Sequence, residues 1–404
     1  MTCQHLLSVR HTVAVVIGFA ALAATPAHAL DLPPGCVEAV PVTCRYQPSR
    51  TYAVGEMDLF MVDPSRSNHL IPFRVRYPIG ATGALPVVLW SHGGSTTSIT
   101  HQTSQGVPVS NGQTGSERRG RSFAAAGYVV VHIGRLSVRD ATLTQSQLDD
   151  CRRIGIGRLA RVDNDPQTDP RALCREFIGW HVYGPQNVAF VAGHLGLLQA
   201  AMPRDFGASL DRDRLVVGGW SGGTQAVMNI AGAAQRWAPV RPFTVGLSQP
   251  AVSVPGVVAF FADAPRRPSF IEDAGDSGFQ DDTLFEIGRR PFLFNSGKND
   301  VGPDVAPTTA RTLPWMSAMP GGKVLAWDRT GVANHATVDL GDVDQGQQVG
   351  CVPGTGQVEL CLAYADLGLA FLDAVVKRRP EAVRWMASDA LQVLADRKIE
   401  LHRR

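Results

Sequence analysis

Short, continuous runs of apolar residues alternate with helical segments along most of this 404-residue chain. Three such runs are LPVVLWSHGG (85–94), YVVVHIG (128–134) and LVVGGW (215–220), and each is typical of a strand that a sheet buries on both faces. SERRGRSFAAAGY (116–128) predicts a helix between the first two strands, and NVAFVAGHLGLLQAAM (187–202) predicts a buried helix before the third. The alternation therefore predicts an α/β fold with a mostly parallel central sheet flanked by helices.

Two irregular stretches, at about 137–182 and 251–288, interrupt this alternation. We interpret residues 30–404 as a single domain in which both stretches are loop or cap insertions, placed where they can cover a site at the strand ends. The phenylalanines of the second stretch are expected to be ordinary core residues. Further strands are expected at 57–63, 71–78, 243–250, 290–300 and 323–330, and further helices at 224–235 and near the C-terminus.

The first 29 residues have the pattern of a secretory signal peptide. Arg10 precedes an apolar run from Thr12 to Ala24, and the small-residue triplet Ala27-His28-Ala29 follows. A transmembrane anchor is the weaker interpretation because the run is too short to span a bilayer. We expect cleavage after Ala29 and a secreted or periplasmic location.

Six of the seven cysteines lie beyond this leader, which contains Cys3. An even number of cysteines in an exported chain favours disulfides over free thiols. Their grouping along the chain favours three short-range pairs, although the sequence cannot exclude other connectivities. The expected pairs are Cys36–Cys44, Cys151–Cys174 and Cys351–Cys361. A zinc site is disfavoured because neither cysteines two residues apart nor paired histidines occur.

The charge balance argues against several classes of partner. The chain has 38 Lys and Arg residues against 36 Asp and Glu residues, a formal net charge of +2. This balance gives no strong field toward nucleic acid or an anionic membrane surface, and no basic stripe interleaves with aromatic residues, so we do not expect nucleic-acid binding. Stable membrane insertion is not expected either. The sequence does not predict an oligomeric state.

Ser221 lies in a G-x-S-x-G pattern within LVVGGWSGGTQAVM (215–228). The flanking residues predict strand, sharp turn and helix, with Gly219 and Gly223 two positions either side of the serine. A serine at the tip of such a turn needs neighbours without a Cβ, and the N-terminus of the following helix can stabilise a developing oxyanion. The alternative interpretation is that Ser221 is a small residue in a structural turn.

A catalytic serine requires a histidine base that a carboxylate orients. Only His335 and His402 follow Ser221, and His402 lies close to the chain terminus, where we do not expect a base to be held rigidly. His335 follows the strand expected at 323–330 and is the predicted base. Asp300, three residues after Gly297, is the preferred acid, with Asp304 as the alternative; either could instead cap a helix.

The predicted oxyanion hole combines the N–H groups of Gly222 and Gly94. Gly94 belongs to the glycine-containing loop that follows the strand at 85–90, and His92 is expected to stabilise this loop. Trp90, Trp220 and Trp180 are candidate residues of an acyl pocket; the alternative for the first two is that they are core residues at strand ends.

At these residues the chain resembles an α/β-hydrolase. Within that superfamily it resembles the secreted bacterial group that contains predicted dienelactone hydrolases and platelet-activating-factor acetylhydrolase-like serine esterases. The resemblance rests on RVRYP, LPVVLWSHGG, GGWSGG, SGKND and NHA, which span most of residues 57–340. Lactone chemistry is not implied, because dienelactone hydrolases proper use cysteine where this chain has Ser221.

The resemblance implies hydrolysis of small or medium acyl esters, either small molecules or lipid-like, through an acyl-enzyme. Ser221 would attack, His335 would act as base and then acid, and Asp300 would orient it, without metal or organic cofactor. A serine peptidase or acyltransferase with the same triad is the first alternative. A secreted binding protein that has kept the fold without catalysis is the second.

Overall fold

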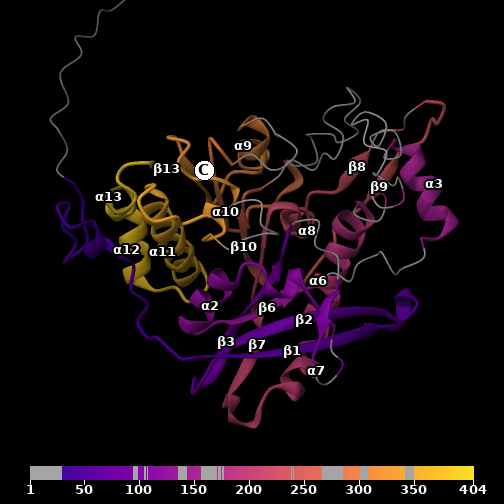
Figure 1. Ribbon diagram of the computed structural model, residues 1–404, viewed down its shortest axis with the longest axis horizontal. Helices are drawn as coiled ribbons and strands as arrows, with labels where there is room; N and C mark the ends of the chain where they lie inside the picture. Colours follow the sequence, from indigo (N-terminus) through magenta and orange to yellow (C-terminus); the bar gives the residue numbers. More distant parts are fainter. Residues whose placement is uncertain are drawn as a thin grey trace, which may run out of the picture.

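The computed structural model describes most of the chain beyond the expected signal peptide (Figure 1). The described residues are 30–93, 99–103, 106, 108–134, 143–155, 171, 174, 177–237, 239, 241–265, 285–300, 308–341 and 350–404. Residues 1–29, on which the signal-peptide prediction falls, lie outside this set.

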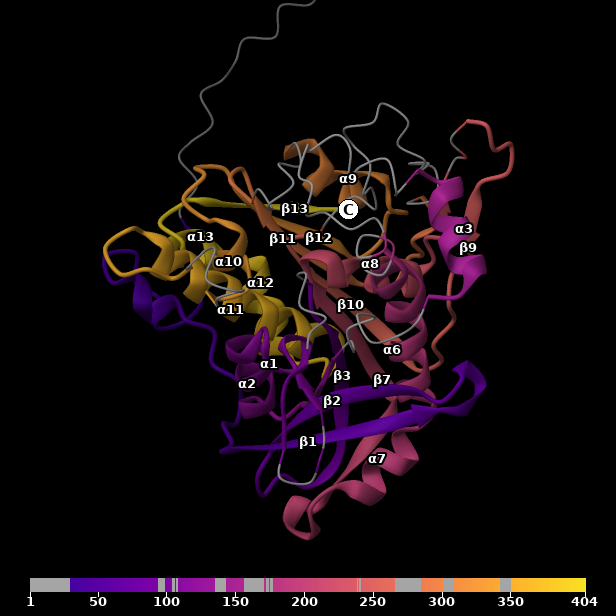
Figure 2. The same ribbon diagram turned by 45° about the vertical axis from the view of Figure 1, so that its right-hand side comes forward.

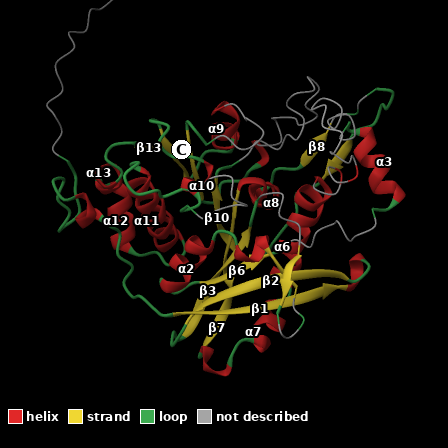
Figure 3. Ribbon diagram, viewed as in Figure 1, coloured by secondary structure: helices red, strands yellow, loops and turns green. Residues whose placement is uncertain are grey.

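A nine-stranded sheet forms the centre of the described structure (Figure 3). Its strands, in spatial order, are β1 (Val54–Asp63), β2 (His69–Pro78), β6 (Val129–Ile133), β3 (Gly83–Ser91), β7 (Ala208–Trp220), β10 (Val257–Asp263), β11 (Phe292–Gly297), β12 (Lys323–Asp328) and β13 (Ile399–Arg403). From β6 to β12 neighbouring strands run parallel, whereas β1, β2 and β13 pair antiparallel at the two edges (Figure 2). The predicted α/β fold with a mostly parallel sheet is confirmed.

Helices cover both faces of the sheet, and each face has its own apolar core. On one face lie α2 (Glu117–Ala125), α11 (Gln357–Val375), α12 (Pro380–Ala387) and α13 (Ala390–Leu394). On the other lie α6 (Gly184–Gly193), α7 (Leu195–Ala201) and α8 (Thr224–Ala231). Shorter or peripheral helices are α1 (Asn111–Thr114), α3 (Gln145–Arg153), α9 (Thr308–Ser317), α10 (His335–Val338) and a π-helix at Ile178–Tyr183.

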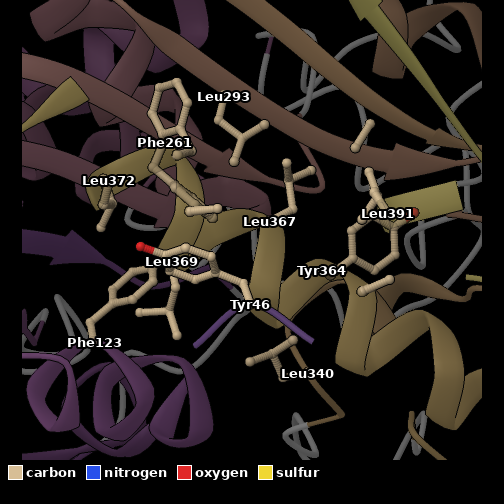
Figure 4. Packing of buried hydrophobic residues seen from close by; sticks show 14 of the residues in the cluster. Tyr46, Phe123, Phe261, Leu293, Leu340, Tyr364, Leu367, Leu369, Leu372 and Leu391 are labelled. Carbon is tan, nitrogen blue, oxygen red and sulfur yellow. The ribbon is translucent and has the colours of Figure 1, made fainter. Parts of the chain in front are cut away.

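Successive strand residues point to opposite faces, which explains the continuous apolar runs in the sequence. In β7, Val216 belongs to the core beneath α11, whereas Leu215 and Val217 belong to the core beneath α8. Figure 4 shows the first of these cores, in which Phe261 and Leu293 from the sheet pack with Leu367 of α11.

All three predicted disulfides form: Cys36–Cys44, Cys151–Cys174 and Cys351–Cys361. The first closes the N-terminal segment that docks on α11, α12 and α13, where Arg45 pairs with Asp366 at 2.6 Å. The second lies in a small separate apolar cluster with Phe177 and Trp237. The disulfide prediction is confirmed.

The interpretation of 251–288 as irregular is wrong for 257–263, which form β10, an interior strand of the sheet. Phe260 and Phe261 are core residues on opposite faces of this strand, as expected for the phenylalanines of this stretch, and residues 266–284 lie outside the described set. The strand expected at 243–250 is reduced to β9 (Leu247–Gln249), which pairs with β8 (Gln235–Trp237) in a separate hairpin. A second hairpin joins β4 (Ile99–Gln102) and β5 (Pro108–Ser110).

Two further expectations need correction. The helix expected at 187–202 is broken at His194, between Gly193 and Gly196, because glycine has low helix propensity. The C-terminal residues form the edge strand β13, in which His402 pairs with Leu325 of β12. This histidine is therefore held in the sheet rather than loose, with its ring centroid 5.7 Å from that of Trp315.

Candidate active site

The predicted catalytic residues follow three strands that all run in the same direction. Ser221 directly follows β7, Asp300 lies three residues after the end of β11, and His335 begins α10 in the segment after β12. Because the carboxyl ends of parallel strands meet at one edge of a sheet, this topology gathers the three residues at that edge.

The turn at Ser221 has the strained backbone that the glycine spacing predicts. Ser221 has a φ of 51°, in the left-handed region that side chains rarely adopt. A Cβ on Gly219 would lie 2.7 Å from the carbonyl oxygen of Ser91, and one on Gly223 would overlap the same carbonyl. Both glycines are required because the end of β3 passes directly against the turn.

Ser221, His335 and Asp300 form a hydrogen-bonded chain. His335 Nε2 lies 2.8 Å from Ser221 Oγ, and His335 Nδ1 lies 2.5 Å from Asp300 Oδ1. Asp300 and His335 are only 1% and 6% exposed, so water does not compete strongly for these contacts. Ser296 Oγ donates to the second carboxylate oxygen of Asp300 at 2.6 Å.

The surroundings keep Asp300 ionised. Burial alone would raise the pKa of its carboxyl, but the neighbouring Arg311 and His335, together with the hydrogen bonds from His335 and Ser296, hold this pKa below its ordinary value. An ionised carboxylate is what a histidine base needs, because it fixes the Nδ1–H tautomer and stabilises the imidazolium.

Several contacts hold the short helix α10 that His335 begins. Asn334 caps it by accepting a hydrogen bond from the Thr337 N–H at 2.8 Å, and Asn334 also forms a β-bridge with Asn299, the residue before Asp300. Trp220 Nε1 donates to the carbonyl oxygen of His335 at 3.1 Å. The segments that bear Asp300 and His335 are thus tied to each other and to the turn at Ser221.

The Cys351–Cys361 disulfide packs directly beneath α10. Cys361 Sγ lies 3.5 Å from the carbonyl oxygen of Thr337. A Cβ on Gly350, the residue before Cys351, would lie 2.5 Å from the amide nitrogen of Thr337. This crosslink therefore packs against the short helix that begins at His335.

Gly222 lies at the start of the helical turn that follows Ser221, as the oxyanion prediction requires. A Cβ on Gly93 would lie 2.5 Å from Ser221 Cβ and 2.8 Å from the Gly222 amide nitrogen, so the chain after β3 runs across the serine. His92 Nδ1 lies 2.7 Å from the carbonyl oxygen of Gly93. Gly94 itself lies outside the described residues, as does the alternative acid Asp304.

The three candidate pocket tryptophans have different placements. Trp90 is fully buried in the core, where its ring packs against Phe123 and Phe261. Trp220 is 2% exposed, and its ring packs near those of His92 and His335, with centroids 4.9 and 4.6 Å away. The Trp180 side chain lies outside the described set.

Two buried arginines near the site belong to no sequence motif and could not be predicted from the sequence. Arg311 of α9 donates to the carbonyl oxygen of Asp300, and Arg119 of α2 pairs with Asp263 at 2.8 Å. Burial raises the pKa of Asp263, although Arg119 and the amide of Asn295 oppose that rise. Asp263 ends the strand β10, so correct assignment of that strand would have placed this carboxyl at the same sheet edge.

Among the described residues, no cluster of three or more His, Cys, Asp or Glu side chains could hold a metal ion. Within the same part of the chain, no helix is both long enough and apolar enough to cross a membrane. In comparisons with known proteins, no family model matches the chain, and neither does any curated protein.

Proposed function

We propose that this chain is a serine hydrolase of the α/β-hydrolase type that cleaves carboxylic esters with small or medium acyl groups. The observation that carries the proposal is the chain of contacts from Ser221 Oγ to His335 Nε2 at 2.8 Å and from His335 Nδ1 to Asp300 at 2.5 Å. A hydroxyl, an imidazole and a buried ionised carboxylate in this order form the arrangement that activates a serine.

In the proposed first step, Ser221 Oγ attacks the ester carbonyl carbon while His335 Nε2 takes the hydroxyl proton. The carbonyl electron pair moves onto oxygen, where the Gly222 N–H and the loop after β3 would stabilise it. Collapse of this intermediate expels the alcohol, which takes the proton from His335 and leaves an acyl group on Ser221. Water then repeats the sequence, and the carboxylic acid leaves.

Three features besides the triad contacts support this proposal. The chain order Ser, Asp, His matches the order expected for an α/β-hydrolase, as does the strained serine turn between strand and helix. A binding protein without catalytic activity would have no use for an ionised carboxylate buried beside a histidine. Three disulfides favour an oxidising location, in agreement with the expected signal peptide.

The test is hydrolysis of nitrophenyl esters of increasing acyl length by residues 30–404 folded under oxidising conditions. Wild type should turn over one or more of these esters, and the Ser221→Ala variant should lose the activity while keeping the same melting temperature. Equal turnover by the two proteins on every ester would refute the proposal. Cleavage of peptides, or acyl transfer to added alcohols, would then assign the site to the alternative peptidase or transferase.

A further inference from the structure

Arg311 joins the acid of the proposed triad to the end of the neighbouring strand β10. Its side chain is 1% exposed. Nε donates to the Asp300 carbonyl oxygen at 2.9 Å, and Nη1 donates to the carbonyl oxygens of Ala264 at 2.9 Å and Pro265 at 3.3 Å. Nη2 lies 3.5 Å from Asp300 Oδ1, the same oxygen that contacts His335.

We propose that Arg311 is a positioning residue that fixes Asp300 at the sheet edge and, through its permanent charge, limits how readily His335 takes up a proton. The catalytic consequence rests on the proposed hydrolase function, whereas the effect on the proton affinity of His335 does not.

The positioning role follows from the backbone that Arg311 binds. Ala264 has a φ of 50°, so the chain leaves β10 through a strained bend whose carbonyl groups accept from the guanidinium. The same guanidinium also donates a hydrogen bond to the carbonyl oxygen of Asp300. The planar guanidinium carries several N–H donors in fixed directions, so it can bind the three carbonyl oxygens at once. A lysine ammonium, a single charged group on a flexible side chain, holds such a set of acceptors less well.

The electrostatic role follows from the shared carboxylate oxygen. A buried, ionised Asp300 favours the imidazolium form of His335, which is not the form that accepts a proton from Ser221. Arg311 supplies a cation at 3.5 Å that partly compensates the carboxylate before His335 is charged. The imidazole is then left free to accept the proton from Ser221.

Among the described residues, the neighbouring groups Asp263, Tyr364 and Asp328 do not supply a replacement cation. Asp263 at the end of β10 is paired with Arg119 from α2, and both side chains are fully buried. Tyr364 from α11 donates its hydroxyl to the Ser296 carbonyl oxygen, and its pKa is raised by burial, so it stays neutral. Asp328 at the end of β12 accepts hydrogen bonds from the loop that leads to His335.

The experiment is an NMR titration of histidine-labelled protein, with the His335 signal assigned from its loss in His335→Gln. Arg311→Gln and Arg311→Met remove the charge, and Arg311→Lys keeps it as the matched control. Arg311 Nη2 and His335 Nδ1 lie 3.5 and 2.5 Å from the same oxygen, Asp300 Oδ1, so they are at most about 6 Å apart. Coulomb repulsion between the guanidinium and the imidazolium over about this distance, at an effective dielectric of about 20, predicts that the neutral variants raise the titration midpoint of His335 by about one to two pH units. In Arg311→Lys the midpoint should move by less than about 0.3 units, because the charge remains.

Arg119→Lys is a second control, because it disturbs a buried arginine at the same strand end without changing the charge. Its His335 midpoint should stay at the wild-type value. A neutral Arg311 variant that folds and titrates at the wild-type midpoint would overturn the proposal. So would a shift in Arg311→Lys as large as that in Arg311→Gln.

Kinetics give an independent readout. The acid limb of kcat/KM for ester hydrolysis should move to higher pH in the neutral variants by the same amount as the NMR midpoint. In Arg311→Lys, kcat should fall, whereas KM and the acid limb of the pH profile should stay at their wild-type values. If neither neutral variant folds, this pattern in Arg311→Lys supports the proposal. An unchanged kcat, or an acid limb displaced to another pH, overturns it. If wild type hydrolyses no ester, the proposed function fails, and the NMR titration still decides the role of the charge.

Discussion

Opening the Cys351–Cys361 disulfide should impair catalysis as well as stability. We consider the double variant in which both cysteines become serine. The crosslink packs beneath α10, with Cys361 Sγ 3.5 Å from the Thr337 carbonyl oxygen and Gly350 against the same helix. Loss of the crosslink therefore removes packing support from α10, the helix that begins at His335.

The expected loss of stability can be calculated from the loop that the disulfide closes. A sequence separation of 10 residues corresponds to about 2.7 kcal/mol of unfolded-state entropy at 25 °C. The Cys36–Cys44 disulfide spans 8 residues and corresponds to about 2.5 kcal/mol. It lies on the N-terminal segment that docks against α11, α12 and α13, with Trp385 Nε1 donating to the Cys44 carbonyl oxygen. The two crosslinks therefore have nearly equal predicted effects on stability but different relations to the site.

The assay compares urea unfolding and ester hydrolysis for the two double serine variants. Both should lose about 2 to 3 kcal/mol of unfolding free energy. Only the Cys351/Cys361 variant should lose kcat, by about 10- to 100-fold, because small misplacements of a catalytic group are costly. Equal kcat losses in the two variants, measured where both are fully folded, would refute the argument that this disulfide positions His335. So would an unchanged kcat in the Cys351/Cys361 variant.

Three further variants test the site directly. Asp300→Asn should lower kcat by about 10⁴-fold, since the amide favours the wrong tautomer of His335. Because the pKa of Asp300 is lowered in the folded protein, its ionisation stabilises the fold fully above about pH 4, and this contribution is lost as pH falls through the folded pKa. Urea titrations of Asp300→Asn below pH 4 should therefore show a shallower loss of stability than wild type, and an identical slope would contradict the assignment. Gly223→Ala places a Cβ on the carbonyl of Ser91 and should lower both the melting temperature and kcat, whereas wild-type values would exclude the close approach. Trp220→Phe keeps a ring beside His335 but removes the Nε1 donor, so unfolding should show a loss of about 1 kcal/mol.

The sequence indicated the parts of the site that local pattern determines. Ser221 could be predicted as the candidate nucleophile because a strained turn requires glycines at fixed spacing. His335 could be predicted as the candidate base because it follows Ser221 in the chain and comes directly after an expected strand. Asp300 was preferred over Asp304 because it lies closer to the strand end, and the structure brings Asp300 to His335. The disulfide pairs were predictable because the six cysteines fall into three groups of neighbours along the sequence, and neighbouring cysteines can pair across a short loop.

Other parts depend on contacts between segments far apart in the chain. Arg311 contacts residues 264 and 265, about 46 positions away, and no spacing rule reports such a contact. Strand β10 could not be predicted from the sequence because a short apolar run next to proline and glycine is equally compatible with an irregular segment. The edge strand β13 was missed because its pattern, Ile-Glu-Leu-His-Arg, is too short and too polar to predict a strand without its partner β12.

The most direct test of the central claim is covalent labelling with an alkyl fluorophosphonate, followed by peptide mass mapping. The reagent forms a bond from phosphorus to an activated serine oxygen and releases fluoride. The proposed mechanism predicts one adduct, on Ser221, with labelling greatly slowed in His335→Gln and Asp300→Asn. An adduct on another residue, or labelling of Ser221 at the same rate in His335→Gln, would contradict the assignment of these residues as a catalytic triad.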